Sequence, residues 1–149
     1  MPPPLKGLQL SNYRNFINKK EIFNFEHTLF KGKNAVGKTN LLESISFLCP
    51  GTGFRKDVLQ NFIFQKQVEL KTSITFNFIH EDLENHLNVI LSNKDERWTK
   101  RYFLNDKKIQ QQKLLDIFQL FWLTETDKVY FIKDIQYQRN TINRIICYF

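Results

Sequence analysis

Eight consecutive residues near the start of the chain have the types and spacing of a phosphate-binding loop. They are Gly32-Lys33-Asn34-Ala35-Val36-Gly37-Lys38-Thr39, which match the pattern Gly-x-x-x-x-Gly-Lys-[Ser/Thr]. In such a loop, glycines let successive backbone N–H groups turn inward around an anion, and the dipole of the following helix adds attraction. The lysine reaches the β- and γ-phosphates, and the threonine hydroxyl is a ligand for Mg²⁺. The loop therefore predicts binding of a nucleoside triphosphate, with Mg²⁺ at Thr39.

The elements that flank this loop are the ones that its geometry requires. A β-prone stretch at residues 28–31 precedes the loop and predicts a short strand. After the loop, apolar residues at helical spacing predict an amphipathic helix that begins near Lys38 and ends at Pro50 and Gly51. The apolar face of this helix comprises Leu41, Leu42, Ile45, Leu48 and Cys49. The alternative, a glycine turn that only starts a helix, does not explain the adjacent lysine and threonine.

Alternating apolar and polar residues elsewhere predict β-strands. Residues 5–10 and 20–25 predict two strands before the loop. A longer alternation over residues 68–104, followed by a turn at Asn105 and Asp106, predicts an antiparallel meander of three strands. On the last of these strands, one face carries Arg97, Thr99 and Arg101.

The last part of the chain has weaker patterns. Residues 110–118 predict a helix, and residues 120–123 predict a buried strand. Thr124 and Asp127 resemble a cap before another helical stretch. Apolar residues within 135–149 predict an amphipathic helix that continues to the end of the sequence.

Composition limits the class of protein. With 149 residues, the chain is expected to be one domain or part of one, spanning residues 1–149. Its 42% hydrophobic and 25% charged residues exclude the disordered and membrane classes. No apolar run approaches the roughly 18 residues of a transmembrane helix, and the start is unlike a signal peptide, so we expect a cytoplasmic protein. Two cysteines without metal-binding spacing favour buried thiols over a disulfide or a metal site.

The charge of the chain is basic. Twenty-two Lys and Arg residues against fifteen Asp and Glu residues give a formal net charge of +7. Such a charge is compatible with a polyanionic partner, a nucleotide or a nucleic acid. A solvated basic surface is the alternative, and both interpretations stay open at this point.

Further motifs lie on both sides of the loop. The opening Leu8-x-Leu10-x-Asn12-Tyr13-Arg14-Asn15-Phe16 resembles the pattern L-x-L-x-N-[FY]-R-[NS]-[FY] of the RecF family, ABC-type DNA-repair ATPases related to Rad50 and the SMC proteins. Residues 37–45 are similar to the run GKTNLLEAI of that family. Weaker matches follow at residues 50–55, 102–107 and 121–124. The resemblance covers nearly the whole chain and is most specific over residues 8–55.

This resemblance implies a fold, cofactors and partners. The fold would be an α/β P-loop NTPase lobe, like the head of an ABC-type ATPase, with an antiparallel meander, and incomplete in this sequence. The cofactors would be ATP and Mg²⁺. The partners would be DNA at single-strand gaps or junctions, other recombination mediators and, in full-length members, a second copy bound through ATP. The expected function is ATP binding and DNA binding in recombinational repair and replication, where such proteins help to load a recombinase.

The resemblance also implies roles for residues outside the loop. Arg14 and Asn15 correspond to the turn with which the family reaches its nucleotide, and a solvated turn is the alternative. Four basic residues are candidates for contacts with DNA phosphates, on the reasoning that they share one face of a lobe. They are Arg55, Arg97, Lys100 and Arg101. The alternative for these four is a solvated basic face.

The chain departs from the family pattern at several positions. Ala35 stands where the family usually has glycine, and the backbone there is expected to need a positive φ. Asp106 replaces a hairpin glycine, with a smaller penalty because Asp accepts the left-handed conformation. Residues 137–144 lack most of the charged residues of the corresponding family segment.

The motifs that hydrolysis requires are missing from the sequence. ATPases of this class use a Walker B strand that ends in Asp-Glu, and a glycine-containing signature motif. All five glycines precede residue 54, and the nearest imitation of a Walker B strand, residues 113–116, has two apolar residues before its acid. We therefore expect an N-terminal fragment that binds ATP without hydrolysing it. The alternatives are a small stand-alone P-loop kinase or NTPase, and an inert remnant of a decayed gene.

Overall fold

The computed structural model of this 149-residue chain describes residues 4–24, 27–50, 57–64, 71–122, 134–136 and 138–139. By their contacts, the residues form two compact units, Met1–Phe118 and Gln119–Phe149. The strands and helices named below all lie in the first unit. In the second unit, the described residues include a short helical turn in which the Gln138 N–H donates to the Asp134 carbonyl at 3.0 Å.

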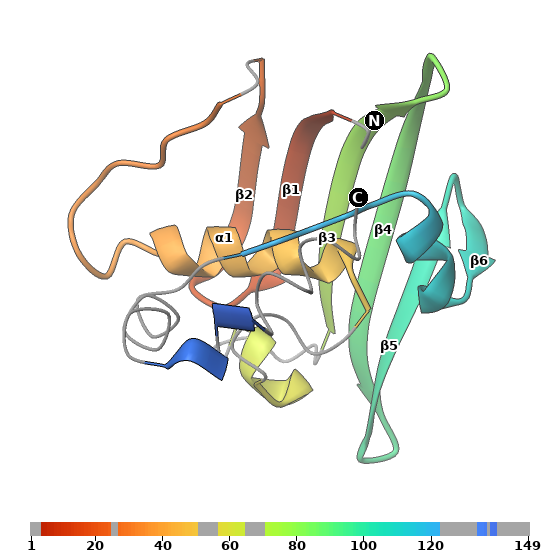
Figure 1. The fold of residues 1–149 in the computed structure, drawn as a ribbon. Coiled ribbons are helices and arrows are strands. Elements are labelled where there is room, and N and C mark those ends of the chain that lie inside the picture. Colours follow the sequence, from red (N-terminus) through yellow and green to blue (C-terminus); the bar gives the residue numbers. More distant parts are fainter. Residues whose placement is uncertain are drawn as a thin grey trace. The chain divides into compact units, whose positions relative to one another are not determined.

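Within the described residues, six antiparallel strands form one sheet in the order β2-β1-β3-β4-β5-β6 (Figure 1). The strands are β1 (Leu5–Tyr13), β2 (Phe16–Ile22), β3 (Lys71–His80), β4 (Leu83–Lys94), β5 (Arg97–Leu104) and β6 (Lys107–Ile109). Strands β3 to β6 follow one another as neighbours, which is the predicted meander with one short strand added. Strand β1 pairs with β3, so the hairpin that precedes the P-loop joins the meander in one sheet.

The alternation of side chains explains why these segments are strands. On β3, the residues Thr72, Ile74, Phe76 and Phe78 are buried and their neighbours are not. On β4, the buried residues are Leu87, Val89 and Leu91. A period of two puts every second side chain on the same face of a sheet. The meander is therefore confirmed from residue 71 onward, and residues 68–70 lie outside the described part of the chain.

The three hairpins of the meander turn without glycine. Each has a two-residue turn in which both residues have positive φ, between 47° and 64°, as in a type I′ turn. The turns are Glu81-Asp82, Asp95-Glu96 and Asn105-Asp106. Asn and Asp adopt this backbone more readily than other residues because their short polar side chains bond locally. The turn predicted at Asn105 and Asp106 is confirmed, including the left-handed conformation of Asp106.

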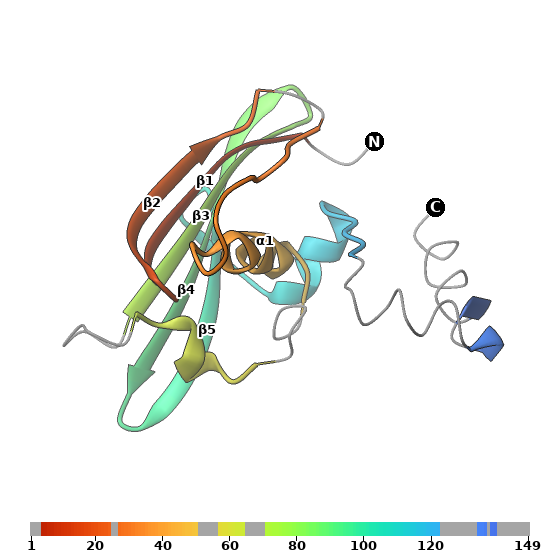
Figure 2. The ribbon, with the colours of Figure 1, turned by 90° about the vertical axis from the view of Figure 1, so that its left-hand side faces the viewer.

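The described helices of the first unit lie on one side of the sheet (Figure 2). Helix α1 (Lys38–Ile45) continues into a short 3-10 helix, η1 (Ser46–Leu48), and two more 3-10 helices follow, η2 (Leu59–Phe62) and η3 (Gln111–Asp116). We call the covered face of the sheet the inner face and the opposite one the outer face. Helix η3 lies where residues 110–118 predicted a helix, in the tighter 3-10 form.

The hydrophobic core lies between the inner face and these helices. Strands β1, β3 and β4 contribute aliphatic and phenylalanine side chains, and the helical side contributes aromatic rings. Phe47 packs edge-on against Phe62 with 5.0 Å between ring centres, and Phe78 packs against Phe118 at 4.8 Å. Edge-to-face pairs at these distances add to the free energy gained by burial. This core fixes helix α1, and with it the P-loop, on the sheet.

The strand predicted at residues 28–31 is wrong. These residues have no strand pairing, Leu29 is 87% exposed, and Phe30 makes a ring contact with Phe23 at 6.2 Å between centres. A strand needs a partner for its backbone N–H and C=O groups. None of the described strands pairs with these residues, although β2 is an edge strand that pairs only with β1.

The apolar face predicted for the first helix is also partly wrong. Leu42 is 49% exposed, whereas Glu43 and Ser44 are fully buried. Buried polar groups are tolerated when they are hydrogen-bonded. The Ser44 hydroxyl donates to the Leu41 carbonyl at 2.6 Å, and Glu43 accepts bonds from Arg14.

Other predicted elements differ at their ends or fall outside the described residues. The strand predicted at 20–25 begins earlier, because β2 forms a tight hairpin with β1 and ends at Ile22. Residues 120–122 are not a strand, since no strand pairs with them in the described part, and Phe121 and Trp122 are exposed. The cap at Thr124 and Asp127 lies outside the described residues, as does almost all of the helix within 135–149.

Tyr102, on β5, provides a test of this core. Its side chain is 2% exposed, and its hydroxyl has no hydrogen-bond partner among the described residues. Burial raises the pKa of Tyr102 well above its ordinary value, and nearby Cys49 raises it further. Removing an unpaired buried hydroxyl is nearly neutral or stabilising. We expect Tyr102→Phe to leave the free energy of unfolding unchanged or to raise it by up to about 1 kcal/mol, measured by urea denaturation. A clear loss of stability would show that the hydroxyl is hydrogen-bonded in solution.

Candidate nucleotide-binding site

Helix α1 starts at the lysine of the loop motif, as the sequence predicts. Residues 32–37 form the loop, and Lys38 is the first helical residue. Gly37 has a φ of 102°, and a Cβ atom built there would lie 2.6 Å from both Asn15 Nδ2 and the ring of Phe16. A side chain at this position would have an unfavourable backbone conformation and no space. The loop therefore requires glycine at this position.

The backbone at Ala35 is left-handed too, with a φ of 65°. The departure from the family pattern predicted a positive φ here, and the structure confirms it. A residue other than glycine loses roughly 1–2 kcal/mol in this conformation. With left-handed residues at 35 and 37, the loop keeps the alternation that turns successive N–H groups to one side.

The side chains of the motif gather around one hollow. It has a volume of about 270 Å³ and is lined by Asn34, Ala35, Gly37, Lys38, Thr39 and Asn40. The Lys38 ammonium donates hydrogen bonds to the carbonyls of Gly32 at 2.8 Å and Lys33 at 2.7 Å, so its charge lies over the loop. The Thr39 side chain is exposed at the start of the helix. A cation, a hydroxyl and turned backbone amides in one hollow fit a triphosphate with Mg²⁺.

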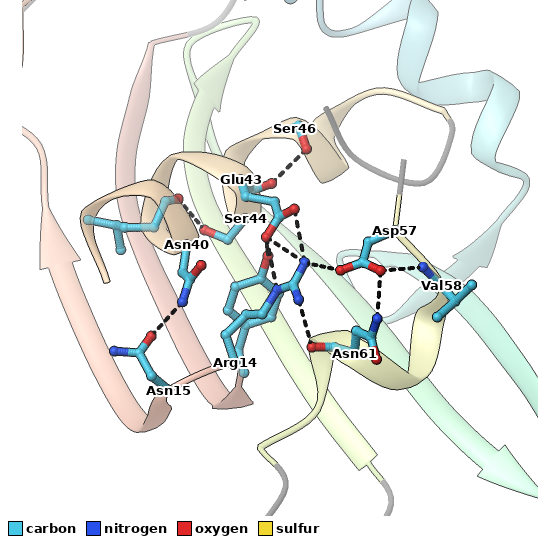
Figure 3. Close-up of polar contacts among 11 residues, drawn as sticks. Arg14, Asn15, Asn40, Glu43, Ser44, Ser46, Asp57, Val58 and Asn61 are labelled. Atoms are coloured by element: carbon cyan, nitrogen blue, oxygen red, sulfur yellow. Dashed lines mark hydrogen bonds and ion pairs between the residues drawn. The ribbon is translucent and has the colours of Figure 1, made fainter. Parts of the chain in front are cut away.

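Asn15, in the turn between β1 and β2, contacts the loop. Its Nδ2 donates to the Val36 carbonyl at 3.2 Å. Its Oδ1 accepts a bond from Asn40 Nδ2 at 2.9 Å (Figure 3). Asn15 therefore touches both the loop and the first turn of α1. The resemblance implies a nucleotide contact for Asn15, and the structure places it beside the loop backbone.

Arg14, from the same turn, contacts α1 farther along, at Glu43, and lies in a cluster of acceptors (Figure 3). Its Nε donates to Glu43 at 2.9 Å, and its Nη2 donates to Glu43 at 3.0 Å and to Asp57 at 2.8 Å. Its Nη1 donates to the Asn61 carbonyl at 3.0 Å. The guanidinium carbon lies 4.4 Å from the centre of the Phe62 ring. These bonds hold the Arg14 guanidinium within the chain. A contact between Arg14 and the nucleotide stays a prediction.

The charges of this cluster stabilise one another. Asp57 has a pKa below its usual value, chiefly because Asn61 donates a hydrogen bond to the carboxylate, with Arg14 adding to the effect. Burial alone lowers the pKa of Arg14, but the hydrogen bond to Asp57 and the charge of Glu43 outweigh it, so the net shift is upward. Glu43 itself has no exposed surface. A fully buried carboxylate requires such a partner.

The basic residues proposed as DNA contacts do not share one face. Arg97 and Arg101 are exposed on the outer face of β5. Lys100 lies on the inner face, with its ammonium 5.5 Å from the centre of the Phe47 ring, and burial lowers its pKa. Alternate residues of a strand point to opposite faces, so the premise of one face fails for Lys100. Arg55 lies outside the described residues.

Sequence reasoning assigned no role to four polar residues that organise this site. They are Asn40, Glu43, Asp57 and Asn61. The sequence contains no signal for the burial of Glu43, because position 43 lies off the apolar face predicted for the helix. The partners themselves lie far apart in sequence. In the described part of the chain, no three His, Cys, Asp or Glu side chains are grouped to hold a metal ion, and no helix is long and apolar enough to cross a membrane.

The sequence is similar to those of DNA repair proteins. The family model described as the RecF/RecN/SMC N terminal domain matches residues 4–126. The DNA replication and repair protein RecF of Agrobacterium fabrum is 28% identical over 143 residues, which cover 95% of this chain and 38% of that protein. The protein of the same name from Rickettsia typhi is 30% identical over 148 residues, with the same two coverages of 95% and 38%.

The fold is similar to that of a solved structure of the recombination mediator protein RecF-ATP in the RecFOR pathway. The TM-score is 0.74 at 23% identity, covering 99% of this chain and 39% of that one. The described part of the chain is a partial head lobe, mostly antiparallel sheet with one α-helix. The chain spans 38% of the length of the two RecF relatives. It belongs to the RecF/RecN/SMC N-terminal domain family, as a part of a RecF-like protein.

Proposed function

We propose that the chain is the ATP-binding N-terminal part of a RecF-type protein that acts on DNA in recombinational repair and replication. The observation that carries this proposal is the loop at residues 32–39, with its left-handed Gly37 and with Lys38 at the first position of α1. ATP would lie with its phosphates in the hollow, and Thr39 would be a Mg²⁺ ligand. The antiparallel sheet and the family match give no support to the stand-alone kinase.

The proposal is limited to binding by this chain. Hydrolysis would need an acidic Mg²⁺ partner and a signature motif, and neither is present in the sequence. In the whole protein, a second copy and other recombination mediators would complete the assembly. The chain matches less than half of its relatives, so these partners are part of the proposal.

The outer face of the sheet supports the DNA-binding part of the proposal. Strand pairing places six cations and a single carboxylate, Glu84, on this face within the described strands. The cations are Lys20, Lys71, Lys94, Arg97, Arg101 and Lys108. Serine, threonine and asparagine side chains lie between them on β3 and β4. Lysine and arginine among small polar donors are the residues that contact nucleic-acid phosphates.

Replacing the loop lysine tests nucleotide binding. We expect Lys38→Ala to weaken ATP binding at least tenfold, because a hydrogen bond to a charged group contributes about 1.5–3 kcal/mol. Titration with a fluorescent ATP analogue in the presence of Mg²⁺ measures the dissociation constant. Lys31→Ala, which removes an equal charge from an exposed position just before the loop, is the control. Equal affinities of Lys38→Ala and the parent chain would contradict the proposal.

Replacing Ala35 tests the shape of the loop. Glycine adopts the left-handed conformation without the penalty of roughly 1–2 kcal/mol, so Ala35→Gly should leave the ATP affinity equal or higher. The same titration provides the measurement, and thermal denaturation controls for changes in folding. A weaker affinity with unchanged stability would show that the loop does not hold the anion in the conformation described here.

Removing two outer-face arginines tests DNA binding. We expect the double variant Arg97→Ala with Arg101→Ala to lose roughly tenfold in affinity for a gapped duplex, and to lower the salt slope by about 2, one for each phosphate contact. Fluorescence anisotropy over a range of salt concentrations measures both quantities. Lys113→Ala, on η3, removes a charge from the other side of the sheet and serves as the control. An unchanged salt slope would exclude these arginines as phosphate contacts.

A further inference from the structure

The turn between β1 and β2 grips helix α1 at two points. Asn15 bonds to Asn40, and Arg14 bonds to Glu43 (Figure 3). Residues three apart on a helix lie on the same side of it. Two adjacent turn residues therefore contact α1 at two points on the same side, beginning two residues after Lys38, in the first helical turn.

The contact between Arg14 and Glu43 is the stronger of the two. Arg14 donates to both oxygens of Glu43, and an ion pair bound at two points is fixed in direction as well as in distance. The Glu43 carboxylate is fully buried, so a motion of α1 away from Arg14 would leave a buried charge without its cationic partner. The position of the helix and the position of the turn are therefore coupled.

A third element is tied to the same turn. The Arg14 backbone N–H donates to the Phe62 carbonyl at 2.8 Å, and Tyr13 forms a β-bridge with Ile63. The side chain of Arg14 adds bonds to Asp57 and to the Asn61 carbonyl. Four of the five N–H donors of a guanidinium are thus used within the chain. Arg14 has a φ of 52°, a conformation that persists where the surroundings determine it.

The turn reaches the phosphate-binding loop through Asn15. Its side-chain amide donates a hydrogen bond to the Val36 carbonyl. In a planar trans peptide the C=O and the next N–H point in opposite directions. The bond to Asn15 therefore turns the Gly37 N–H away from Asn15, and Gly37 lines the hollow proposed for the phosphates. One peptide of the phosphate-binding loop is therefore oriented by a side chain from the β1–β2 turn.

We propose that Arg14 and Asn15 are positioning residues for the phosphate loop, with the Arg14–Glu43 pair fixing the turn on α1 and Asn15 orienting the peptide between Val36 and Gly37. Arg14 acts through Asn15 and not by contact with the nucleotide. This inference rests on the proposed ATP binding, and it assigns a different role to Arg14 from the direct contact that the family resemblance implies.

ATP affinity separates the two roles of Arg14. If Arg14 positions the loop, Glu43→Gln weakens binding of the fluorescent ATP analogue, by about the same factor as Arg14→Ala, and the double variant is no weaker than either single variant. If Arg14 contacts the phosphates directly, Glu43→Gln releases the guanidinium and leaves the affinity equal or higher, which overturns the proposal. Ser73→Ala, which removes a hydrogen bond to Asn88 between β3 and β4, is the control for a general loss of side-chain bonds.

Asn15→Ala separates positioning from stability. Asn15 is exposed, so its removal should change the melting temperature little while weakening ATP binding about tenfold. Hydrogen exchange of the chain without nucleotide gives a second measurement, in which Asn15→Ala should accelerate exchange in residues 32–40 and leave β3 and β4 unchanged. If the parent chain binds no ATP, the proposed function fails, and the exchange experiment still tests the positioning role. Unchanged exchange in residues 32–40 would overturn it.

Discussion

A carboxylate without exposed surface sets the arrangement around the loop. Glu43 lies in the second turn of α1, and its charge is compensated there by Arg14, which approaches with two N–H groups. That approach requires the β1–β2 turn to lie against the helix, and it brings residues 57–62 to the other side of the same guanidinium. Hydrophobic packing of α1 on the sheet contributes most of the stabilising free energy. The Arg14–Glu43 pair fixes the orientation of α1 on the sheet. Apolar contacts alone would allow α1 to rotate or slide by a residue, whereas a two-point ion pair does not.

The part of the site that is local in sequence was predictable, and the part that depends on distant residues was not. The loop at 32–39, the start of α1 at Lys38 and the positive φ at Ala35 follow from backbone rules that act over a few residues. The partners of Arg14 lie about thirty to fifty positions away in sequence, and their side chains meet only when the sheet and helix are packed. A single sequence has no signal for these contacts, and Glu43 even lies off the apolar face predicted for the helix.

In the fold, too, features that are local in sequence were predictable, and features that depend on distant residues were not. The meander was predictable because each strand has its own period of two, and the hairpin at Asn105 and Asp106 because short polar residues accept left-handed backbone. The prediction for residues 28–31 failed because β-propensity describes a segment, while a strand exists only with a neighbour. Lys100 shows a third case. Its neighbours Arg97 and Arg101 are close to it in sequence, yet the pleat puts its charge against aromatic rings on the inner face.

The glycine-free turns have an electrostatic consequence. Their acidic residues, Glu81, Asp82, Asp95, Glu96 and Asp106, sit at both ends of the hairpins, beyond the strands that carry the cations of the outer face. At the end of the sheet that carries Glu81, Asp82 and Asp106, an approaching polyanion meets repulsion, whereas the middle of the outer face attracts it. At the other end, Lys94 and Arg97 flank Asp95 and Glu96 and balance their charge. Such a pattern orients a charged ligand before any contact forms, and it acts on the rate of association more than on the final affinity. The effect reaches about 8 Å at physiological salt, so added salt would slow the encounter while the buried Arg14–Glu43 pair stays largely unscreened.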